Sequence, residues 1–294
     1  MNSLKIVKLE FTLKATGEFT LPRFVGNTLR GAIGNALVQI YCDKHDPKCD
    51  SCDNRDECVY SNVFKSKYTT EYLPTVPNPF TIDIGRTKRI YISGDKLCFG
   101  VTLIGDAIYY CGNFIEAVKY AAEHNFGERN LPVELVSVRD EFSDAVLKSA
   151  DDFDTEYDHI YAEWTDSNTQ NEADHIHIEF LTPFIYSNQN CENITFYEFM
   201  DRLFDRISAI TDVYGDNEFV LPYSFAVHKN KINTVCDLKP VIVKQKNKEY
   251  EASIGTIDFY GNLTRYIPYI ILGQEIHFGK MTTRGFGQYK VDIL

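Results

Sequence analysis

The sequence lacks any long apolar run. No stretch reaches the roughly 18 consecutive apolar residues that mark a membrane-spanning helix. The N-terminal residues Met1–Lys5 also lack the apolar core of a secretory signal. We therefore expect a cytoplasmic protein with no membrane partner, whose eight cysteines are reduced thiols or metal ligands rather than disulfides.

Positive charge is scarce overall, but it is unevenly distributed. The chain has 30 Lys and Arg residues against 42 Asp and Glu residues, a net charge of −12, and residues 149–174 hold nine acidic residues and no basic one. By contrast, residues 1–100 hold 14 basic and 11 acidic residues, and residues 229–294 hold 10 and 6. If the two ends meet, they form a basic face on an acidic protein; the alternative is an uneven, solvated surface without a partner.

Hydrophobic periodicity predicts the same order of elements twice. The first half shows a strand over 4–15, a helix after Pro22, strands around 80–92 and 97–104, a helix over 107–124 and a strand over 131–138. The second half shows a strand over 175–181, a helix between a Thr195–Glu198 capping box and Gly215, strands near 241–244 and 253–260, a helix over 266–272 and a strand over 289–293.

This repeated order predicts an α+β fold made of two tandem ferredoxin-like (RRM-like) βαββαβ domains. We expect residues 1–172 to form the first domain, which includes a cysteine-rich insertion over 42–60 and the acidic segment 149–174 as a linker. Residues 173–294 are expected to form the second domain.

The first expected helix is unusually rich in glycine. Gly26, Gly31 and Gly34 each cost the helix about 1 kcal/mol relative to alanine. We interpret them as places where a strand or RNA packs very close. Arg23 and Arg30 lie on another face of this helix and are candidate RNA contacts, with surface ion pairs as the alternative.

Four cysteines lie close together directly after this helix. Cys42, Cys49, Cys52 and Cys58 follow the pattern C-x6-C-x2-C-x5-C, and His45 lies inside the set. Thiolates at such spacing in a reducing compartment most simply bind zinc tetrahedrally, and the metal then supplies folding energy to a polar segment. An iron–sulfur site and unmetallated thiols are the alternatives.

The most informative segment is residues 273–289, here called the glycine-rich loop. Glycine permits close backbone approach, and successive N–H groups in such a loop form an anion-binding concavity. The segment matches neither G-x-x-x-x-G-K-[ST] nor a G-x-G-x-x-G after a strand, so nucleotide-binding fingerprints do not apply. A phosphate backbone fits it, and an ordinary glycine-rich turn is the alternative. Its glycines and its basic residues are Gly273, Gly279, Gly285, Gly287, His277, Lys280 and Arg284.

Taken together, several motifs closely resemble one known family. They are Leu29–Leu37, the four cysteines with Tyr60 and Phe64 after them, Ile254–Gly261, and the glycine-rich loop. In this order they resemble the CRISPR precursor-RNA-processing endoribonucleases of the RAMP superfamily, in the branch with a cysteine-rich insertion. The resemblance spans nearly the whole chain, and the glycine-rich loop is its most specific element.

The resemblance implies an activity as well as a fold. It implies binding of CRISPR repeat RNA and one cut at the 3′ side of the repeat hairpin, without a catalytic metal. The ribose 2′-OH attacks the adjacent phosphate and leaves a 2′,3′-cyclic phosphate and a 5′-OH. It also implies a CRISPR effector complex or integration proteins as further partners.

Site residues follow from the resemblance position by position. His277 matches a position that is often histidine and is the candidate acid or base, with a loop-structuring histidine as the alternative; Lys280 is the candidate transition-state cation. Many relatives keep a catalytic histidine on or just after the first helix, whereas residues 22–41 contain none and His45 is the nearest. Arg284 stands where relatives often have an apolar residue. The expected RNA contacts are Arg23, Arg30, Gly279, Thr282, Thr283, Arg284, Gly285 and Gly287.

Two other functions stay open at this level. A RAMP-fold subunit that only holds CRISPR RNA in an effector complex is favoured by the missing first-helix histidine. A zinc-containing module that binds a protein through the acidic segment is the second. Cleavage of repeat RNA in EDTA separates the nuclease from the RNA-holding subunit.

Overall fold

The structure, a computed structural model, falls into two compact units. It describes residues 2–43, 49–65, 75–85, 87–124, 126–127, 129–143, 146–147, 162–166, 172–186, 191–215, 220, 232–245 and 248–294. The N-terminal unit comprises Lys5–Tyr68 and Asn78–Ala162; the C-terminal unit comprises Met1–Leu4, Thr69–Pro77 and Glu163–Leu294. The division at Ala162 and Glu163 lies inside the acidic segment 149–174, most of which is outside the described residues.

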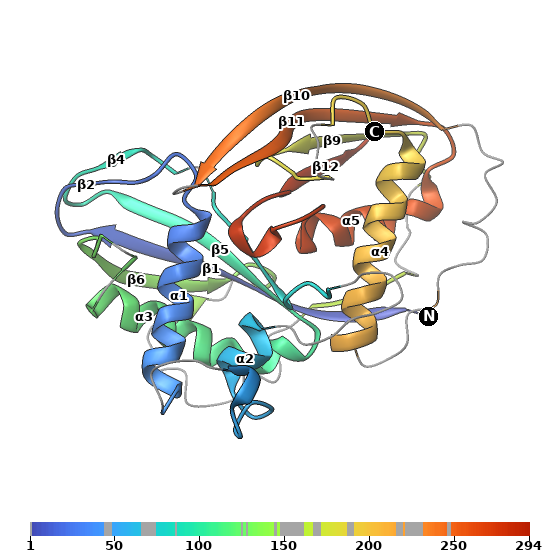
Figure 1. Cartoon of the computed structure of the whole chain (residues 1–294). Helices are drawn as coiled ribbons and strands as arrows, with labels where there is room; N and C mark the ends of the chain where they lie inside the picture. The colour runs from blue at the N-terminus through green and yellow to red at the C-terminus, as the bar shows by residue number, and fades with distance from the viewer. Residues whose placement is uncertain are drawn as a thin grey trace. The chain divides into compact units, whose positions relative to one another are not determined.

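The N-terminal unit is a ferredoxin-like sheet with the long helices α1 and α3 packed on it (Figure 1). Its central strand alternates buried and less buried residues, and the apolar stripe of the first helix (Val25, Leu29, Ile33 and Leu37) is fully buried. Its elements are β1 (Ser3–Ala15), β2 (Phe19–Thr20), α1 (Gly26–Tyr41), α2 (Val59–Phe64), β3 (Phe80–Asp83), β4 (Ile90–Tyr91), β5 (Lys96–Ile104), α3 (Cys111–His124), β6 (Val133–Asp140) and β7 (Val146–Leu147).

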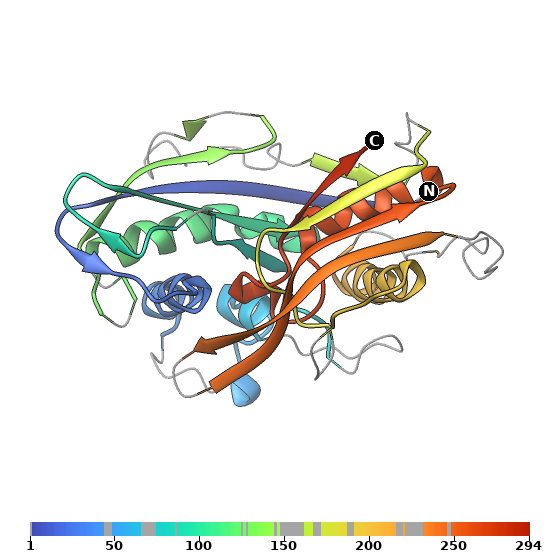
Figure 2. The same cartoon turned by 90° about the horizontal axis from the view of Figure 1, so that it is seen from above.

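The C-terminal unit repeats this plan with a longer strand hairpin. Helices α4 and α5 lie on one face of its four-stranded sheet (Figures 1 and 2). Thr195 and Glu198 form the expected capping box at the start of α4. The elements are β8 (Ala162–Thr165), β9 (His175–Phe180), α4 (Phe196–Tyr214), β10 (Asn233–Gln245), β11 (Lys248–Tyr260), α5 (Ile267–Ile276) and β12 (Tyr289–Ile293).

The two sheets share one topology. The strand orders are β3-β5-β1-β6-β7 and β10-β11-β9-β12. In each unit the first strand lies between the third and fourth strands of its βαββαβ repeat and pairs antiparallel with both. The prediction of two tandem ferredoxin-like domains is therefore confirmed.

Some element boundaries differ from the sequence-based expectation. The hairpin of β10 and β11 pairs from Asn233 with Tyr260 to Gln245 with Lys248, so both strands are longer than expected. The strand expected over 80–92 is divided into β3 and β4, and the first turns of the helix expected from Ala107 are 3₁₀. Of the helices in the described ranges, none is both long and apolar enough to span a bilayer.

Candidate nucleic-acid interface

The glycine-rich loop connects the end of α5 to β12 and needs glycine at two positions. At Gly287, where φ is 72°, an added Cβ would lie 1.8 Å from the carbonyl oxygen of Phe278. At Gly279, where φ is 78°, an added Cβ would lie 2.5 Å from the carbonyl oxygen of Ile185. Both glycines therefore serve close contact of backbone with backbone.

Several N–H groups of this loop are used inside the protein. The N–H of Phe278 donates to Gly287 at 2.8 Å, that of Gly287 to Pro183 at 2.9 Å, and that of Lys280 to Ile185 at 3.0 Å. The expectation that the loop offers a row of N–H groups to an anion does not hold for these donors. The glycines instead let the loop lie against a neighbouring segment of backbone.

That neighbouring segment, residues 181–186, also joins the sheet. Phe184 and Ser253 on β11 exchange backbone hydrogen bonds of 2.8 and 2.9 Å. The N–H of Gln288 donates to the hydroxyl of Thr182 at 3.0 Å. The loop, the segment 181–186 and β11 are thus held together by successive hydrogen bonds, which fix the loop on the sheet.

A buried arginine supports the loop from within the unit. Arg206 on α4 is 4% exposed and donates to the carbonyl of Ile276 from Nε at 3.1 Å and Nη2 at 2.7 Å, and to the hydroxyl of Thr282 at 2.9 Å. Burial lowers the pKa of Arg206 to about 9, so it is charged at neutral pH. A cation at the carbonyl end of α5 is stabilised by the helix dipole.

The sequence-based reading missed Arg206, although its position carries a signal. Helical spacing places it on the apolar stripe of α4, between Leu203 and Ile210. An arginine on a buried helix face needs polar partners, and here they are Ile276 and Thr282 of the glycine-rich loop.

His277 lies in the interior of the loop. It is 1% exposed, and its Nδ1 is 3.3 Å from the carbonyl oxygen of Phe286. Its φ of 63° is unusual for a residue other than glycine. These contacts are those of a residue that organises the loop, and its role as acid or base stays a prediction.

The loop residues expected to bind RNA are divided between surface and interior. Lys280 is exposed, and Arg284 is half-buried, with its Nη1 3.4 Å from the hydroxyl of Tyr250. Thr282 is 3% exposed and faces Arg206, whereas Thr283 is half-buried. Gly279 is half-buried, and Gly285 and Gly287 are buried. Lys280 and Arg284 therefore carry the loop's positive charge toward solvent.

In the N-terminal unit, the expected RNA contacts lie at and near the start of α1. Arg23 precedes the helix and is exposed. The guanidinium of Arg30 lies 4.8 Å from the centroid of the Phe64 ring, which Tyr60 stacks against at 5.3 Å. Gly34 permits this arrangement, because an added Cβ would lie 2.8 Å from Cε1 of Phe64. The residues of the expected motif after the cysteines thus hold Arg30.

The four cysteines lie between helices α1 and α2. Cys42 follows α1, Cys49 begins a 3₁₀ turn that ends at Ser51, and Cys58 precedes α2. Burial raises the pKa of the Cys49 thiol. Within the described ranges, which omit His45, no three His, Cys, Asp or Glu residues stand in a metal-binding arrangement. Zinc therefore stays a prediction.

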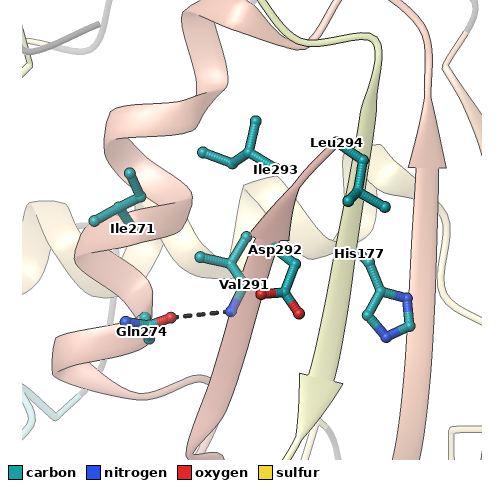
Figure 3. Close-up of a pocket in the computed structure, with 7 residues that line it drawn as sticks. All are labelled: His177, Ile271, Gln274, Val291, Asp292, Ile293 and Leu294. Carbon is teal, nitrogen blue, oxygen red and sulfur yellow. Dashed lines mark hydrogen bonds between the residues drawn. The ribbon is translucent and has the colours of Figure 1, made fainter. Parts of the chain in front are cut away.

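A pocket of about 520 Å³ lies elsewhere on the C-terminal unit (Figure 3). Gln274 closes one side of it, since its Oε1 accepts a hydrogen bond of 2.9 Å from the N–H of Val291 on the edge strand β12. None of the side chains expected to bind or cut RNA lines it. The lining residues are His177, Ile271, Gln274, Val291, Asp292, Ile293 and Leu294.

Two family models match adjacent parts of the chain. Residues 4–165 match the model of the AF_1859_N N-terminal domain. Residues 178–289, which include the glycine-rich loop, match the model of the CRISPR-associated endoribonuclease Cas6. Together the models cover both units.

Known proteins resemble the chain more in fold than in sequence. An "Uncharacterized protein" of Archaeoglobus fulgidus is 23% identical over 141 residues, which is 48% of each chain, so the match spans about half of that relative. A Cas6 product complex superposes with a TM-score of 0.59 at 12% identity, over 98% of this chain and 100% of that one.

Two further structures show the same likeness. Thermus thermophilus Cas6 gives a TM-score of 0.57 at 10% identity, over 99% of this chain and 100% of that one. A partial Cas6-RT-Cas1–Cas2 complex gives 0.63 at 10% identity, over 99% of this chain but only 46% of that one.

Proposed function

We propose that this chain is a Cas6-type CRISPR-associated endoribonuclease of the RAMP superfamily, which cuts precursor CRISPR RNA within its repeats; the match of residues 178–289 to the Cas6 family model supports this. The 2′-OH of one ribose attacks the adjacent phosphate. The products carry a 2′,3′-cyclic phosphate and a 5′-OH, and no catalytic metal takes part.

The glycine-rich loop carries this proposal. It lies inside the segment matched by the Cas6 family model, it is fixed on the sheet by Pro183 and Ile185, and it presents Lys280 at its surface. A rigid backbone with an exposed cation suits a phosphate whose charge grows during the reaction. Lys280 stabilises the pentacovalent phosphate. Further RNA contacts come from Arg23, Arg30, Gly279, Thr282, Thr283, Arg284, Gly285 and Gly287.

His277 is the proposed acid or base, and its burial sets the test. If His277 is catalytic, His277→Ala lowers the cleavage rate about 10²–10⁴-fold and leaves the RNA affinity unchanged. If His277 only organises the loop, His277→Ala lowers RNA affinity and thermal stability together. His277→Asn then restores both, because its amide offers a hydrogen-bond donor to the carbonyl of Phe286. Single-turnover rates, binding constants and melting temperatures of the two variants separate these roles.

The alternative is an RNA-holding subunit that does not cut. Two observations favour it: residues 22–41 contain no histidine, and His277 is 1% exposed. His45, the nearest histidine after α1, is outside the described residues. Such a subunit binds repeat RNA as tightly as a nuclease and leaves it intact.

The proposed partners are repeat RNA and CRISPR integration proteins. The Cas6 product complex, which shares the fold, supports RNA as a partner. The Cas6-RT-Cas1–Cas2 complex, which also shares the fold, supports integration proteins as partners. Docking to an effector complex rests on the sequence resemblance alone.

We also propose a structural zinc ion at Cys42, Cys49, Cys52 and Cys58. The close spacing of the four cysteines in the sequence supports it, and the ion would tie the end of α1 to the start of α2. Metal analysis of the purified protein tests this: about one zinc per chain is expected, and its absence after gentle purification removes the site.

The decisive experiment is incubation with repeat RNA in EDTA, followed by mapping of both product ends. We expect one cut with a cyclic phosphate, and none when the ribose before the cut is 2′-deoxy. Zinc content and melting temperature are measured in the same EDTA buffer, because loss of structural zinc could also stop cleavage. Tight binding without a cut by zinc-loaded protein establishes the RNA-holding alternative.

A further inference from the structure

An aromatic column rises from the core of the C-terminal unit beside the glycine-rich loop. Phe199 on α4 stacks on Phe278 of the loop with ring centroids 4.5 Å apart and planes 11° apart. Phe278 in turn lies parallel to Tyr186, at 6.4 Å and 13°. Phe199 and Phe278 are fully buried, whereas Tyr186 is half-buried. The buried rings therefore fix the plane of a ring that reaches the surface.

A guanidinium adds to this column. Cζ of Arg202 on α4 lies 5.2 Å from the centroid of the Tyr186 ring. Its only ion pair in the described part of the chain is with Asp205, at 3.7 Å, and the two side chains are 48% and 37% exposed. An exposed pair at this distance contributes little and exchanges easily. Arg202 thus presents a planar, half-exposed group over a ring whose orientation is set by the core.

The column is tied to the cation that the proposed reaction uses. The N–H of Lys280 donates to the carbonyl of Ile185, the residue before Tyr186. The Lys280 side chain therefore leaves the backbone next to the chain that carries Tyr186. A planar group and a cation at neighbouring positions offer single-stranded RNA one place for a base and one for a phosphate.

The charges around Arg202 favour a base over a phosphate. Asp201 and Asp205 lie on either side of it on α4. Their carboxylates repel a phosphate at this place but not the neutral face of a base. We propose that Arg202 and Tyr186 form a stacking subsite for one nucleobase of the RNA, adjacent to the phosphate held by Lys280. This subsite rests on the proposed function of the loop.

The test combines affinity with a signal from the base itself. Repeat RNA with 2′-O-methyl riboses, which cannot be cut, carries 2-aminopurine at each purine position in turn. At one position, wild-type protein quenches the fluorescence, because stacking quenches this base. Tyr186→Leu and Arg202→Ala each abolish that quenching and weaken binding about tenfold.

Conservative variants separate stacking from charge and from misfolding. Tyr186→Phe keeps the ring and is expected to retain quenching and affinity. Arg202→Lys keeps the charge but loses the planar fork, so it is expected to behave like Arg202→Ala. Tyr260→Leu is the matched control: Tyr260 is a partly exposed tyrosine that stacks on His175 at the far end of β11, and its loss leaves both signals unchanged.

The outcomes distinguish this subsite from the proposed function. If Tyr186→Leu and Arg202→Ala fold, bind and quench as the wild type does, the subsite is refuted while cleavage by the loop stands. Wild-type protein with no affinity for repeat RNA overturns both. If the protein binds repeat RNA without cutting it, the affinity and the fluorescence quenching still test the subsite, because both are measured on uncut RNA.

Discussion

The two ferredoxin-like units use glycine for different purposes. In α1 of the N-terminal unit, Gly34 makes room for a side chain, the ring of Phe64. In the glycine-rich loop of the C-terminal unit, Gly279 and Gly287 make room for backbone carbonyls. A ring can rotate or shift, but a carbonyl in a hydrogen-bonded backbone cannot. The same residue type therefore marks an adjustable contact in one unit and a rigid one in the other.

Gly287→Ala tests the rigid case and should have the largest effect. The new Cβ would meet the Phe278 carbonyl at 1.8 Å, at a φ of 72° that alanine itself disfavours. We expect a loss of at least about 4 kcal/mol in the free energy of unfolding of the C-terminal unit, measured by urea titration, and loss of RNA cleavage.

Gly94→Ala is the matched control for that prediction. Gly94 has a φ of 93°, but an added Cβ there meets nothing within 4 Å. Its replacement should cost only the backbone strain, about 1–2 kcal/mol. Equal losses in the two variants would mean that the carbonyl contact contributes nothing and would remove the contrast between the units.

Arg206→Met removes the support beneath the same loop. The carbonyl of Ile276 and the hydroxyl of Thr282 then lose a buried donor. We expect a loss of about 2–3 kcal/mol in the free energy of unfolding, together with faster hydrogen exchange of the loop amides. Unchanged exchange would show that Pro183 and Ile185 hold the loop without help from Arg206.

Elements that depend on neighbouring residues could be predicted from the sequence. The features that could not be predicted depend on contacts between residues far apart in the chain. The capping box of Thr195 and Glu198 and the bounds of β12 are set by neighbouring residues, so the sequence predicted both. The partners of the loop N–H groups, Pro183 and Ile185, lie about a hundred residues earlier in the chain, and no local pattern announces them. The same holds for the column that ends at Tyr186 and for the partners of Arg206, although the place of Arg206 on the apolar stripe of α4 is itself a local signal.

Lys280→Ala probes the charge that the rigid loop presents. We expect repeat-RNA binding to weaken about tenfold and the slope of log Kd against log salt to fall by about 0.7, as for one lost phosphate contact with single-stranded RNA. Lys290→Ala is the control, since Lys290 is exposed on β12 and pairs with Asp292 at 2.6 Å. A Lys280 variant with an unchanged slope would remove the phosphate contact.

Gly34→Ala tests the adjustable case. A Cβ 2.8 Å from Cε1 of Phe64 forces that ring to shift within a cluster that includes Phe80. Overpacking costs about 1–3 kcal/mol, and helix propensity returns about 1 kcal/mol. We expect a net loss of about 1 kcal/mol in the free energy of unfolding, which Phe64→Leu in the same chain should relieve. A loss as large as that of Gly287→Ala would show that the ring cannot adjust.

Gly31→Ala should have the smallest effect and the opposite sign. Nothing in the described part of the protein lies within 4 Å of the position its Cβ would take, so alanine gains helix propensity without a clash. We expect the melting temperature to rise by about 2 °C. Because Gly31 follows Arg30 on α1, the same variant also reports on RNA: a higher melting temperature with weakened repeat-RNA binding would place the RNA backbone against this turn. Unchanged binding would show that Gly31 makes no close contact with RNA. Of these two glycines, Gly34 alone would then be required by a close contact, the one with Phe64.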